Sequence, residues 1–271
     1  MRSNVEELSL QNRQEKVDRW LSPSNPSTNY NKALEQRQHG TGQWFFQNES
    51  YLRWRTERGS LLWLYGIPGC GKTILSSTII EELQKRKDIS ILLYFYFDFT
   101  DTHKQSLESV LRSLISQLYN KEEDVRTHLD LFYSCQSGGQ QPSIKSLCTI
   151  FRDTIKIAGE VWIVLDALDE CQTRKSSPDG GLFNWIWDLR NSQVNIHFLV
   201  TSRPEEDIES AIEEWVSDEY IICLQSNLMG EDIQAYIWAR VREHKGLSRW
   251  KMSPDIQEEI EAALVEKANG M

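Results

Sequence analysis

A buried strand, a glycine-rich loop and an amphipathic helix follow one another without a gap from Leu61 to Leu83, and this order restricts the fold more than any other feature. The strand is the apolar run 61–65, as expected where both faces of a parallel sheet are covered. The loop 66–73 reads GIPGCGKT and fits G-x-x-x-x-G-K-[ST] in full. Apolar side chains then recur at helical spacing. The sequence therefore predicts a phosphate-binding loop between a strand and a helix.

Each part of this loop has a physical task in binding phosphate. Its glycines let the backbone curl so that successive N–H groups point at phosphate oxygens, and the helix that follows adds the positive end of its dipole. Lys72 supplies a point charge for the β- and γ-phosphates, and the Thr73 hydroxyl suits Mg²⁺. A glycine-rich turn that fits by chance is the alternative, which the flanking strand and helix disfavour. The predicted nucleotide-binding residues of this segment are Gly66, Pro68, Gly69, Cys70, Gly71, Lys72, Thr73 and Ile74.

Another apolar strand, 161–165, runs directly into an acidic cluster made of Asp166, Asp169 and Glu170. Ligands of open α/β sheets bind at the carboxyl ends of the strands, and phosphate chemistry needs a carboxylate there to hold Mg²⁺. Asp166 ends the strand, so we predict that it holds the metal together with Thr73. Glu170 has a longer arm than Asp169 and is the preferred residue to orient the attacking water, with Asp169 as the other choice. An acidic first turn that complements a helix dipole is the structural alternative.

Two further segments are candidates for contact with a nucleotide. Arg203 lies at the tip of the fourth predicted strand, where it would sense a γ-phosphate. The alternative is a loop arginine that pairs with Glu205 or Asp207. Thr41 and Gly42 precede the first strand; such a pair is most often only a turn, and contact with the nucleotide base is the second interpretation.

Apolar segments of strand length alternate with amphipathic helices, which is typical of an α/β fold with a parallel sheet. These segments are 61–65, 91–97, 161–165, 195–200 and 220–224. The chain before them reads as a helical lead-in, and after Gln225 the pattern is helix only. We therefore predict a lead-in at 1–58, a nucleotide-binding core at 59–225, and at 226–271 the start of a helical subdomain that is truncated.

Composition restricts the partners. The formal net charge of −10 argues against a nucleic-acid-binding surface, which normally shows a basic face. Five cysteines without a CxxC pair indicate reduced thiols in an intracellular protein. No apolar leader follows Met1, and the longest apolar run, 91–97, is too short to span a bilayer. We predict a cytoplasmic protein with neither nucleic acid nor membrane as a partner.

With these motifs the chain resembles the NACHT-type nucleotide-binding domains of STAND signalling NTPases, in the nephrocystin-like N-terminal form of fungal NLR-like and ankyrin-repeat proteins. The most specific part is the small residue Ala167 between Asp166 and a second acidic pair. The resemblance starts near Trp20 and continues to the last residue. It rests on GTGQW at 40–44, LWLYGIPGCGKT at 62–73, YFDF at 96–99, VLDALDEC at 164–171 and TSRP at 201–204.

The resemblance implies a P-loop NTPase with a parallel five-stranded sheet of order 5-1-4-3-2, followed by a helical bundle and a winged helix. It also implies a switch in an intracellular defence or incompatibility protein, closed with ADP and able to self-associate once ATP and Mg²⁺ bind. Protein partners would be contacted through effector and repeat regions that this sequence lacks. The winged helix, with its nucleotide-contacting histidine, is lacking too, so a complete switch cycle is not expected of this chain alone.

Several functions stay open at this point. The first is an ATP-binding, slowly hydrolysing NTPase core, and the second is a scaffold that binds ADP or ATP without turnover; the sequence barely separates them. A P-loop small-molecule kinase would need an arginine-rich lid, whereas the arginines between the strands are scattered. A GTPase is disfavoured because the signature N-K-x-D is missing after the fourth strand, and the near match at 120–123 precedes the acidic cluster.

Overall fold

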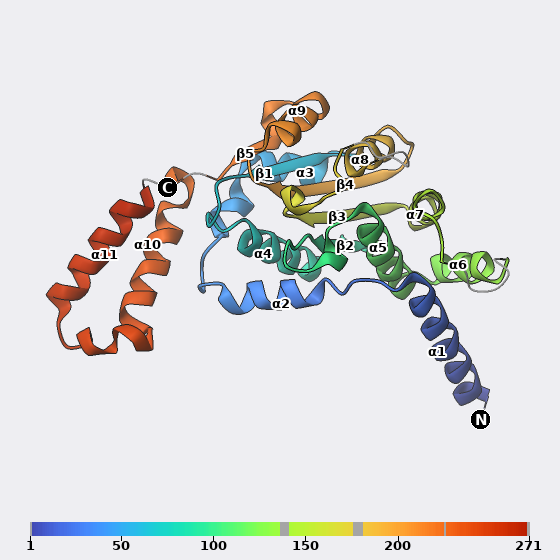
Figure 1. Cartoon of the computed structure of the whole chain (residues 1–271), viewed down its shortest axis with the longest axis horizontal. Helices are drawn as coiled ribbons and strands as arrows, with labels where there is room; N and C mark the ends of the chain where they lie inside the picture. Colours follow the sequence, from blue (N-terminus) through green and yellow to red (C-terminus); the bar gives the residue numbers. More distant parts are fainter. Residues whose placement is uncertain (1, 136–140, 176–180, 225, 270–271) are drawn as a thin grey trace.

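The computed structural model describes residues 2–135, 141–175, 181–224 and 226–269, and within them a parallel sheet forms the centre (Figure 1). The strand order is β2-β3-β4-β1-β5, and every neighbouring pair is parallel. This is the predicted order 5-1-4-3-2 read from the other edge, so the fold prediction is confirmed. The strands are β1 (Leu61–Tyr65), β2 (Leu92–Tyr96), β3 (Glu160–Asp166), β4 (Asn195–Ser202) and β5 (Ile221–Cys223).

Strand β4 continues two residues beyond the predicted end. Thr201 and Ser202 are polar, but both are fully buried, and their hydroxyls have partners inside the sheet. The Thr201 hydroxyl donates to a carboxylate oxygen of Asp166, and the Ser202 hydroxyl accepts from the indole Nε1 of Trp63 at 2.9 Å. Because these hydrogen bonds satisfy the hydroxyls, the strand does not end where its apolar run ends.

Helices cover both faces of the sheet, and consecutive side chains of β1 enter two separate cores. Leu61 and Trp63 pack with side chains of α1 and of α5 to α9, whereas Leu62 and Leu64 pack with α3 and α4. The α-helices are α1 (Arg2–Leu21), α2 (Ser27–Gln36), α3 (Glu49–Thr56), α4 (Lys72–Lys85), α5 (Leu107–Lys121), α6 (Glu123–Cys135), α7 (Ile144–Ala158), α8 (Leu182–Arg190), α9 (Glu206–Trp215), α10 (Ser226–Glu243) and α11 (Pro254–Asn269). Short 3₁₀ helices are η1 (Gln43–Gln47), η2 (Thr102–Lys104), η3 (Leu168–Glu170), η4 (Asp218–Tyr220) and η5 (Lys245–Trp250).

The lead-in helix α1 is joined to the core at its C-terminal end and leads away from the body toward the N-terminus (Figure 1). Arg112 of α5 is buried and donates to the carbonyl of Leu21 at 2.7 Å, so it satisfies an acceptor that the end of α1 leaves unpaired. Ser116, one turn further along α5, donates to Asp18 at 3.1 Å. These contacts fix where α1 meets the sheet layer.

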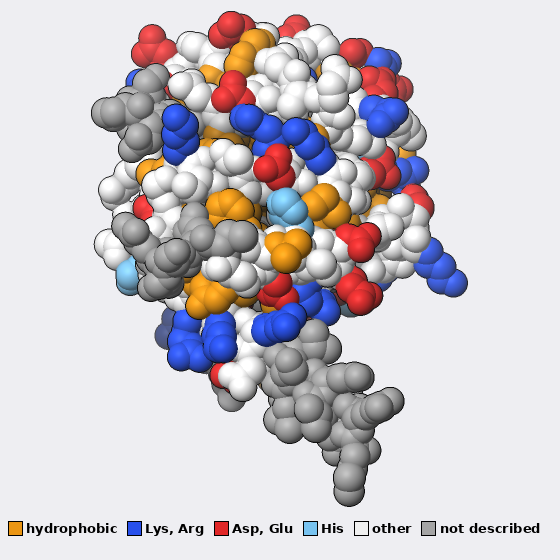
Figure 2. Space-filling view, turned by 90° about the vertical axis from the view of Figure 1, so that its right-hand side faces the viewer, with side chains coloured by type: hydrophobic (Ala, Val, Ile, Leu, Met, Phe, Trp, Pro, Cys, Tyr) orange, Lys and Arg blue, Asp and Glu red, His pale blue; other side chains and the backbone are white. Residues whose placement is uncertain are grey.

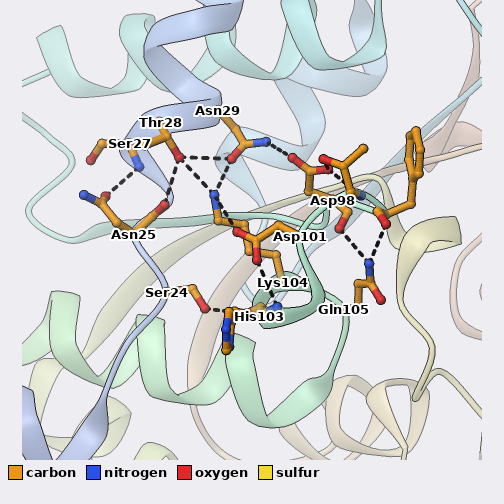
Figure 3. A network of polar contacts seen from close by, with 12 residues as sticks. Ser24, Asn25, Ser27, Thr28, Asn29, Asp98, Asp101, His103, Lys104 and Gln105 are labelled. Carbon is orange, nitrogen blue, oxygen red and sulfur yellow. Dashed lines mark hydrogen bonds and ion pairs between the residues drawn. The ribbon is translucent and has the colours of Figure 1, made fainter.

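A network of polar side chains ties the start of α2 to the loop after β2 (Figure 3). The buried ammonium of Lys104 donates to Thr28 Oγ1 at 2.9 Å and to Asn29 Oδ1 at 2.6 Å. Asn29 in turn donates to Asp98 Oδ2 at 2.9 Å. Burial opposes ionisation of Asp98, but hydrogen bonds from Thr100 and Asn29 outweigh it and hold the pKa of Asp98 below its usual value. The lead-in is therefore fastened to the carboxyl edge of the sheet.

Helices α10 and α11 form a hairpin that lies beside the sheet domain (Figure 1). Arg242 of α10 pairs with Glu261 of α11 at 3.1 Å. A groove of about 880 Å³ runs between the two helices, and its lining includes Trp238 together with Glu231 and Glu258. None of the predicted nucleotide-binding residues lines this groove.

The surface carries both signs of charge. On the face shown in Figure 2, groups of Lys and Arg side chains are separated by acidic and hydrophobic side chains. Within the part of the chain that the structure describes, none of the helices combines the length and the apolar character that crossing a membrane requires.

Candidate functional site

The predicted phosphate loop lies between β1 and α4, and its backbone geometry explains why it contains glycines. Gly69 and Gly71 have φ values of 84° and 85°, in the left-handed region that glycine adopts without strain. A Cβ on Gly66 would lie 2.7 Å from Cys70 Sγ and 3.0 Å from the carbonyl oxygen of Leu224, which leaves no space for a side chain. Cys70 is half-buried with its sulfur turned toward Gly66. The first residue of the loop is thus packed closely between Cys70 and Leu224.

The ammonium of Lys72 lies within the loop. Its Nζ donates to the carbonyl of Gly66 at 2.6 Å and to that of Ile67 at 2.9 Å, and lies 3.6 Å from Cys70 Sγ. The lysine is the first residue of α4, so its charge adds to the positive end of the helix dipole. Charge and dipole together make the loop a site for an anion.

Thr73 and Asp166, the two predicted metal ligands, are in direct contact. The Thr73 hydroxyl donates to Asp166 Oδ2 at 2.8 Å, and the Thr201 hydroxyl donates to Asp166 Oδ1 at 2.7 Å. The carboxyl is almost completely buried. Burial raises the pKa of Asp166, while the hydrogen bonds from Thr201 and Thr73 and the charge of Lys72 oppose that rise. A cation beside this carboxylate would relieve the cost of its burial.

These donors fit Mg²⁺. A carboxylate and a hydroxyl are hard oxygen ligands, and Mg²⁺ at phosphate sites takes only one or two protein oxygens, with waters and phosphate oxygens completing its octahedron. Within the described residues no group of three or more His, Cys, Asp and Glu side chains is arranged to hold a metal. The chemistry of Thr73 and Asp166 therefore suits a metal that binds together with a nucleotide.

Ala167 turns the chain between the metal carboxylate and the second acidic pair. Its φ of 61° and ψ of 55° are left-handed, which costs a residue with a Cβ about 1–2 kcal/mol. Its backbone N–H donates to Thr201 Oγ1 at 2.9 Å. Alanine bears this cost like any residue with a Cβ, and its side chain packs partly buried against the apolar core. After it, η3 carries Asp169 and Glu170 along the carboxyl edge of the sheet.

The structure brings Asp169 and Arg203 together. Asp169 Oδ1 accepts from the backbone N–H of Arg203 at 3.0 Å, and its Oδ2 lies 3.2 Å from Arg203 Nε. The alternative that Arg203 pairs with Glu205 or Asp207 is wrong. Those two carboxylates lie 2.7 Å and 3.3 Å from nitrogen atoms of Arg174.

Glu170 follows Asp169 in η3, and its side chain reaches the segment just after β2. Its Oε2 accepts from the backbone N–H of Phe99 at 2.8 Å. Burial raises the pKa of Glu170; the hydrogen bond from Phe99 opposes this, and the charges of Asp169 and Asp98 add to it. A carboxyl with a raised pKa at the carboxyl edge of a sheet is a candidate for proton transfer.

Thr41 and Gly42 lie against α4. A Cβ on Gly42 would lie 3.5 Å from side-chain atoms of Leu75 and Thr78, and the φ of Gly42 is 81°. The Thr41 hydroxyl donates to the carbonyl of Gln38 at 2.8 Å, as in a turn. The N–H of Gly42 donates to Asp232. The segment is thus a turn that packs on the helix of the phosphate loop. This position agrees with a simple turn and also with a contact to the nucleotide base.

Sequence reasoning gave no role to Thr201, Arg174 or Asp232. Thr201 follows an apolar run directly, and strand β4 lies beside β3, so its position at the carboxyl edge was a usable signal. Arg174 stands in a polar loop with no periodicity, and Asp232 lies far along the chain from its partner, so neither had a local signal.

Residues 40–203 match the sequence model of the family described as nephrocystin 3, N-terminal. The chain belongs to this family. The prediction of a NACHT-type, nephrocystin-like domain is confirmed, and all residues predicted to bind nucleotide or metal fall within the matched span. Membership of the family supports a nucleotide-binding P-loop domain.

A curated relative is the vegetative incompatibility protein HET-E-1 of Podospora anserina, which is 30% identical over 177 residues. The match covers 63% of this chain and 13% of that protein, so the chain spans a small part of its relative.

Two solved structures are similar at a low level. Cdc6p from Pyrobaculum aerophilum has a TM-score of 0.38 and 12% identity, covering 81% of this chain and 52% of that one. The Walker-type ATPase paby2304 of Pyrococcus abyssi has a TM-score of 0.46 and 12% identity, covering 84% and 67%. At these values the similarity says nothing about function. The assignment of the fold therefore rests on the strand pairing described above.

Proposed function

We propose that this chain is the ATP-binding, slowly hydrolysing core of a nucleotide-dependent signalling switch. The hydrogen bond of 2.8 Å between Thr73 and Asp166 is the observation that carries the proposal. It joins the phosphate loop after β1 to a carboxylate from β3, although β4 lies between these strands. A hydroxyl and a buried carboxylate in contact beside a phosphate loop are what binding of a metal–nucleotide complex requires.

The other residues have roles that follow from their places. The loop N–H groups and Lys72 would bind the phosphates of ATP or ADP. Thr73 and Asp166 would hold Mg²⁺, which when bound neutralises phosphate charge. Glu170 would orient the attacking water and accept its proton. Arg203 would sense the γ-phosphate, and Thr41 and Gly42 would contact the base.

A scaffold that binds nucleotide without turnover is the second candidate, and one observation favours it. Both acidic side chains after Ala167 already have partners, because Asp169 is paired with Arg203 and Glu170 accepts from Phe99. If ATP does not displace these contacts, no carboxylate orients a water, and the domain acts through protein contacts alone.

The experiment that separates the candidates is a steady-state phosphate-release assay on the purified chain with Mg·ATP, after the co-purifying nucleotide has been identified. We expect bound ADP or ATP and slow release that the Glu170→Gln variant lowers. Binding of ATP with release equal to that of the variant selects the scaffold. If the folded chain binds neither ATP nor ADP by calorimetry, both candidates are wrong.

The cellular role follows from the same site. We place the domain in the cytoplasm, in an NLR-like protein of fungal type whose defence or incompatibility response depends on self-association. The name of the relative HET-E-1 supports this assignment. ATP would promote self-association, and effector and repeat regions of a longer protein would contact the protein partners. Light scattering with Mg·ATP and with Mg·ADP tests it: an equal mass in both contradicts the switch.

A further inference from the structure

The pair Asp169–Arg203, at the edge of the site, is a well-defined contact that the proposed function leaves unexplained. Asp169 Oδ1 accepts a hydrogen bond from the backbone N–H of Arg203 at 3.0 Å, and its Oδ2 forms an ion pair with Arg203 Nε at 3.2 Å. The Asp169 side chain is only 4% exposed, whereas that of Arg203 is 45% exposed. A buried carboxylate thus contacts an arginine whose side chain is partly exposed to solvent.

The place of this arginine follows from strand register. Tyr65, the last residue of β1, pairs with Ser202, the last residue of β4. The N–H of Gly66 then donates to the carbonyl of Ser202 at 3.3 Å. Arg203 is the first residue after β4, as Gly66 is the first residue after β1. The two therefore lie at the same edge of the sheet, where the phosphate loop begins.

A second arginine keeps competing carboxylates away from Arg203. Arg174 pairs with Glu205 at 2.7 Å and with Asp207 at 3.3 Å, and it also donates to the backbone carbonyl of Asp169. The acidic residues that follow Arg203 in sequence are therefore engaged by another cation. Asp169 is the carboxylate that holds the side chain of Arg203 within the described residues.

The mode of attachment decides what the guanidinium can do. Nε is the side-chain nitrogen of Arg203 nearest to Asp169, and within the described residues neither Nη atom of Arg203 donates a hydrogen bond. A guanidinium held at Nε keeps a planar set of donors on its two Nη atoms, and such a fork suits the oxygens of a phosphate. Because both oxygens of Asp169 are directed at Arg203, the task of orienting water is left to Glu170.

We infer that Asp169 is a positioning residue: it fixes Arg203 at Nε so that the Nη donors recognise the terminal phosphate of ATP. Asp169 therefore sets the preference of the site for ATP over ADP, and it does not act on the attacking water. This inference rests on the proposed function, since it requires the phosphate loop to bind a nucleotide. It assigns Asp169 a task that neither the acidic motif nor the family match specifies.

The test compares affinities for ADP and for the slowly hydrolysed analogue ATPγS, both with Mg²⁺, by calorimetry on the whole chain. Arg203→Ala and Asp169→Asn should each lower the preference for ATPγS by about tenfold. The affinity for ADP should stay within about twofold in both, because only the terminal phosphate loses a partner. The double variant should equal Arg203→Ala alone, since residues that act as one unit are not additive.

Two further variants sharpen the result. Glu205→Gln removes a nearby carboxylate that binds Arg174 and not Arg203, and it should keep the wild-type preference. Arg203→Lys keeps the charge beside Asp169 but offers no forked donors, so it should lose the preference as Arg203→Ala does. This variant also serves if Asp169→Asn does not fold.

Distinct outcomes overturn the inference and the proposed function. Wild-type preference in Asp169→Asn, or additive losses in the double variant, shows that Asp169 does not act through Arg203. Wild-type preference in Arg203→Lys overturns the role of the Nη fork. In all these cases ADP still binds and the proposed function stands. If the wild-type chain binds neither nucleotide, the proposed function fails, and the inference fails with it.

Discussion

The carboxylate of Asp232 accepts a hydrogen bond of 2.8 Å from the backbone N–H of Gly42, 190 residues away along the chain. The same oxygen accepts from the indole Nε1 of Trp44 at 3.0 Å. Within the described residues, these two are the hydrogen bonds that join the α10–α11 hairpin to the rest of the molecule. Since Gly42 packs on α4, one carboxylate connects the hairpin to the helix of the phosphate loop.

Removing this carboxylate should loosen the hairpin. Hydrogen bonds to a charged acceptor contribute about 1.5–3 kcal/mol each, so Asp232→Ala should speed amide exchange at 42–44 and along α10 by tenfold or more. Hydrogen exchange followed by mass spectrometry measures this. Glu231→Ala is the matched control, because Glu231 is exposed and lines the groove between the hairpin helices. Unchanged exchange at 42–44 would show that the contact does not hold the hairpin.

Lys72→Ala should abolish nucleotide binding and leave the fold intact. Loss of a charge partner of a phosphate costs about 2–5 kcal/mol, or roughly 30- to 3,000-fold in affinity. Lys72 is only half-buried and lies at the start of α4, so the loss of its side chain leaves no large core defect. Calorimetry with Mg·ATP and Mg·ADP measures the loss, and circular dichroism checks the fold. Lys85→Ala, at the other end of α4, should bind normally. Wild-type affinity in Lys72→Ala would remove the phosphate-loop assignment.

Glu170→Gln should keep affinity for Mg·ATP and lower turnover, because orientation of water matters only in the transition state. The amide oxygen of Gln can still accept from the N–H of Phe99, so the local contact survives. Asp166→Asn is the contrast: it removes a charge from the metal site and should weaken metal-dependent binding. Single-turnover hydrolysis measured beside Mg·ATP affinity separates the two effects. Normal hydrolysis by Glu170→Gln would move the water-orienting role elsewhere.

The lowered pKa of Asp98 predicts that the stability of the fold depends on pH. Its hydrogen bonds from Thr100 and Asn29 hold its folded-state pKa below the unfolded value of about 3.9. The unfolded state then binds more protons in this window, so the contribution of Asp98 is present above about pH 4 and is lost as pH falls through the folded pKa. Relative to Asp98→Asn, the wild type should be more stable by about 1–2 kcal/mol near neutral pH, because an amide would oppose two donor groups.

The measurement is chemical denaturation of wild type and Asp98→Asn between about pH 3 and pH 8, over which the carboxyl titrates. The difference in free energy of unfolding should be constant near neutral pH and shrink toward the acid end. Asp153→Asn is the control, since Asp153 is 45% exposed and lies 3.9 Å from Lys156 at the surface. A difference that does not change with pH would contradict the role of the Asp98 charge.

The sequence was most informative where one local pattern decides the structure. The apolar runs gave the strands because their side chains are buried on both faces of the sheet. Asp166 was identifiable because it follows such a run directly. The ends of α7 also follow from local patterns: Ser143 accepts from the N–H of Ser146, and Gly159, which follows the last residue, has a φ of 83°. The strand order came from the family resemblance and not from any of these patterns.

The sequence was least informative where segments meet across strands. The pairing of Asp169 with Arg203 depends on the register of β3 against β4 and on the left-handed turn at Ala167, and neither is written in a local pattern. The partner of Asp232 is 190 residues away, so no periodicity could indicate it. The apolar pattern of β4 ends two residues before the strand does, because Thr201 and Ser202 are polar and hydrogen bonding lets them be buried.

The close approach of Leu224 to Gly66 has a consequence for making chimaeras of this domain with its relatives. The carbonyl of Leu224 would lie 3.0 Å from a Cβ on Gly66, and its N–H donates to Tyr65 at 2.7 Å. Leu224 therefore belongs to the wall of the phosphate loop, although it follows the last strand. A graft of a foreign helical hairpin should be joined after this leucine, because a junction before it would replace part of the nucleotide-binding loop's own support.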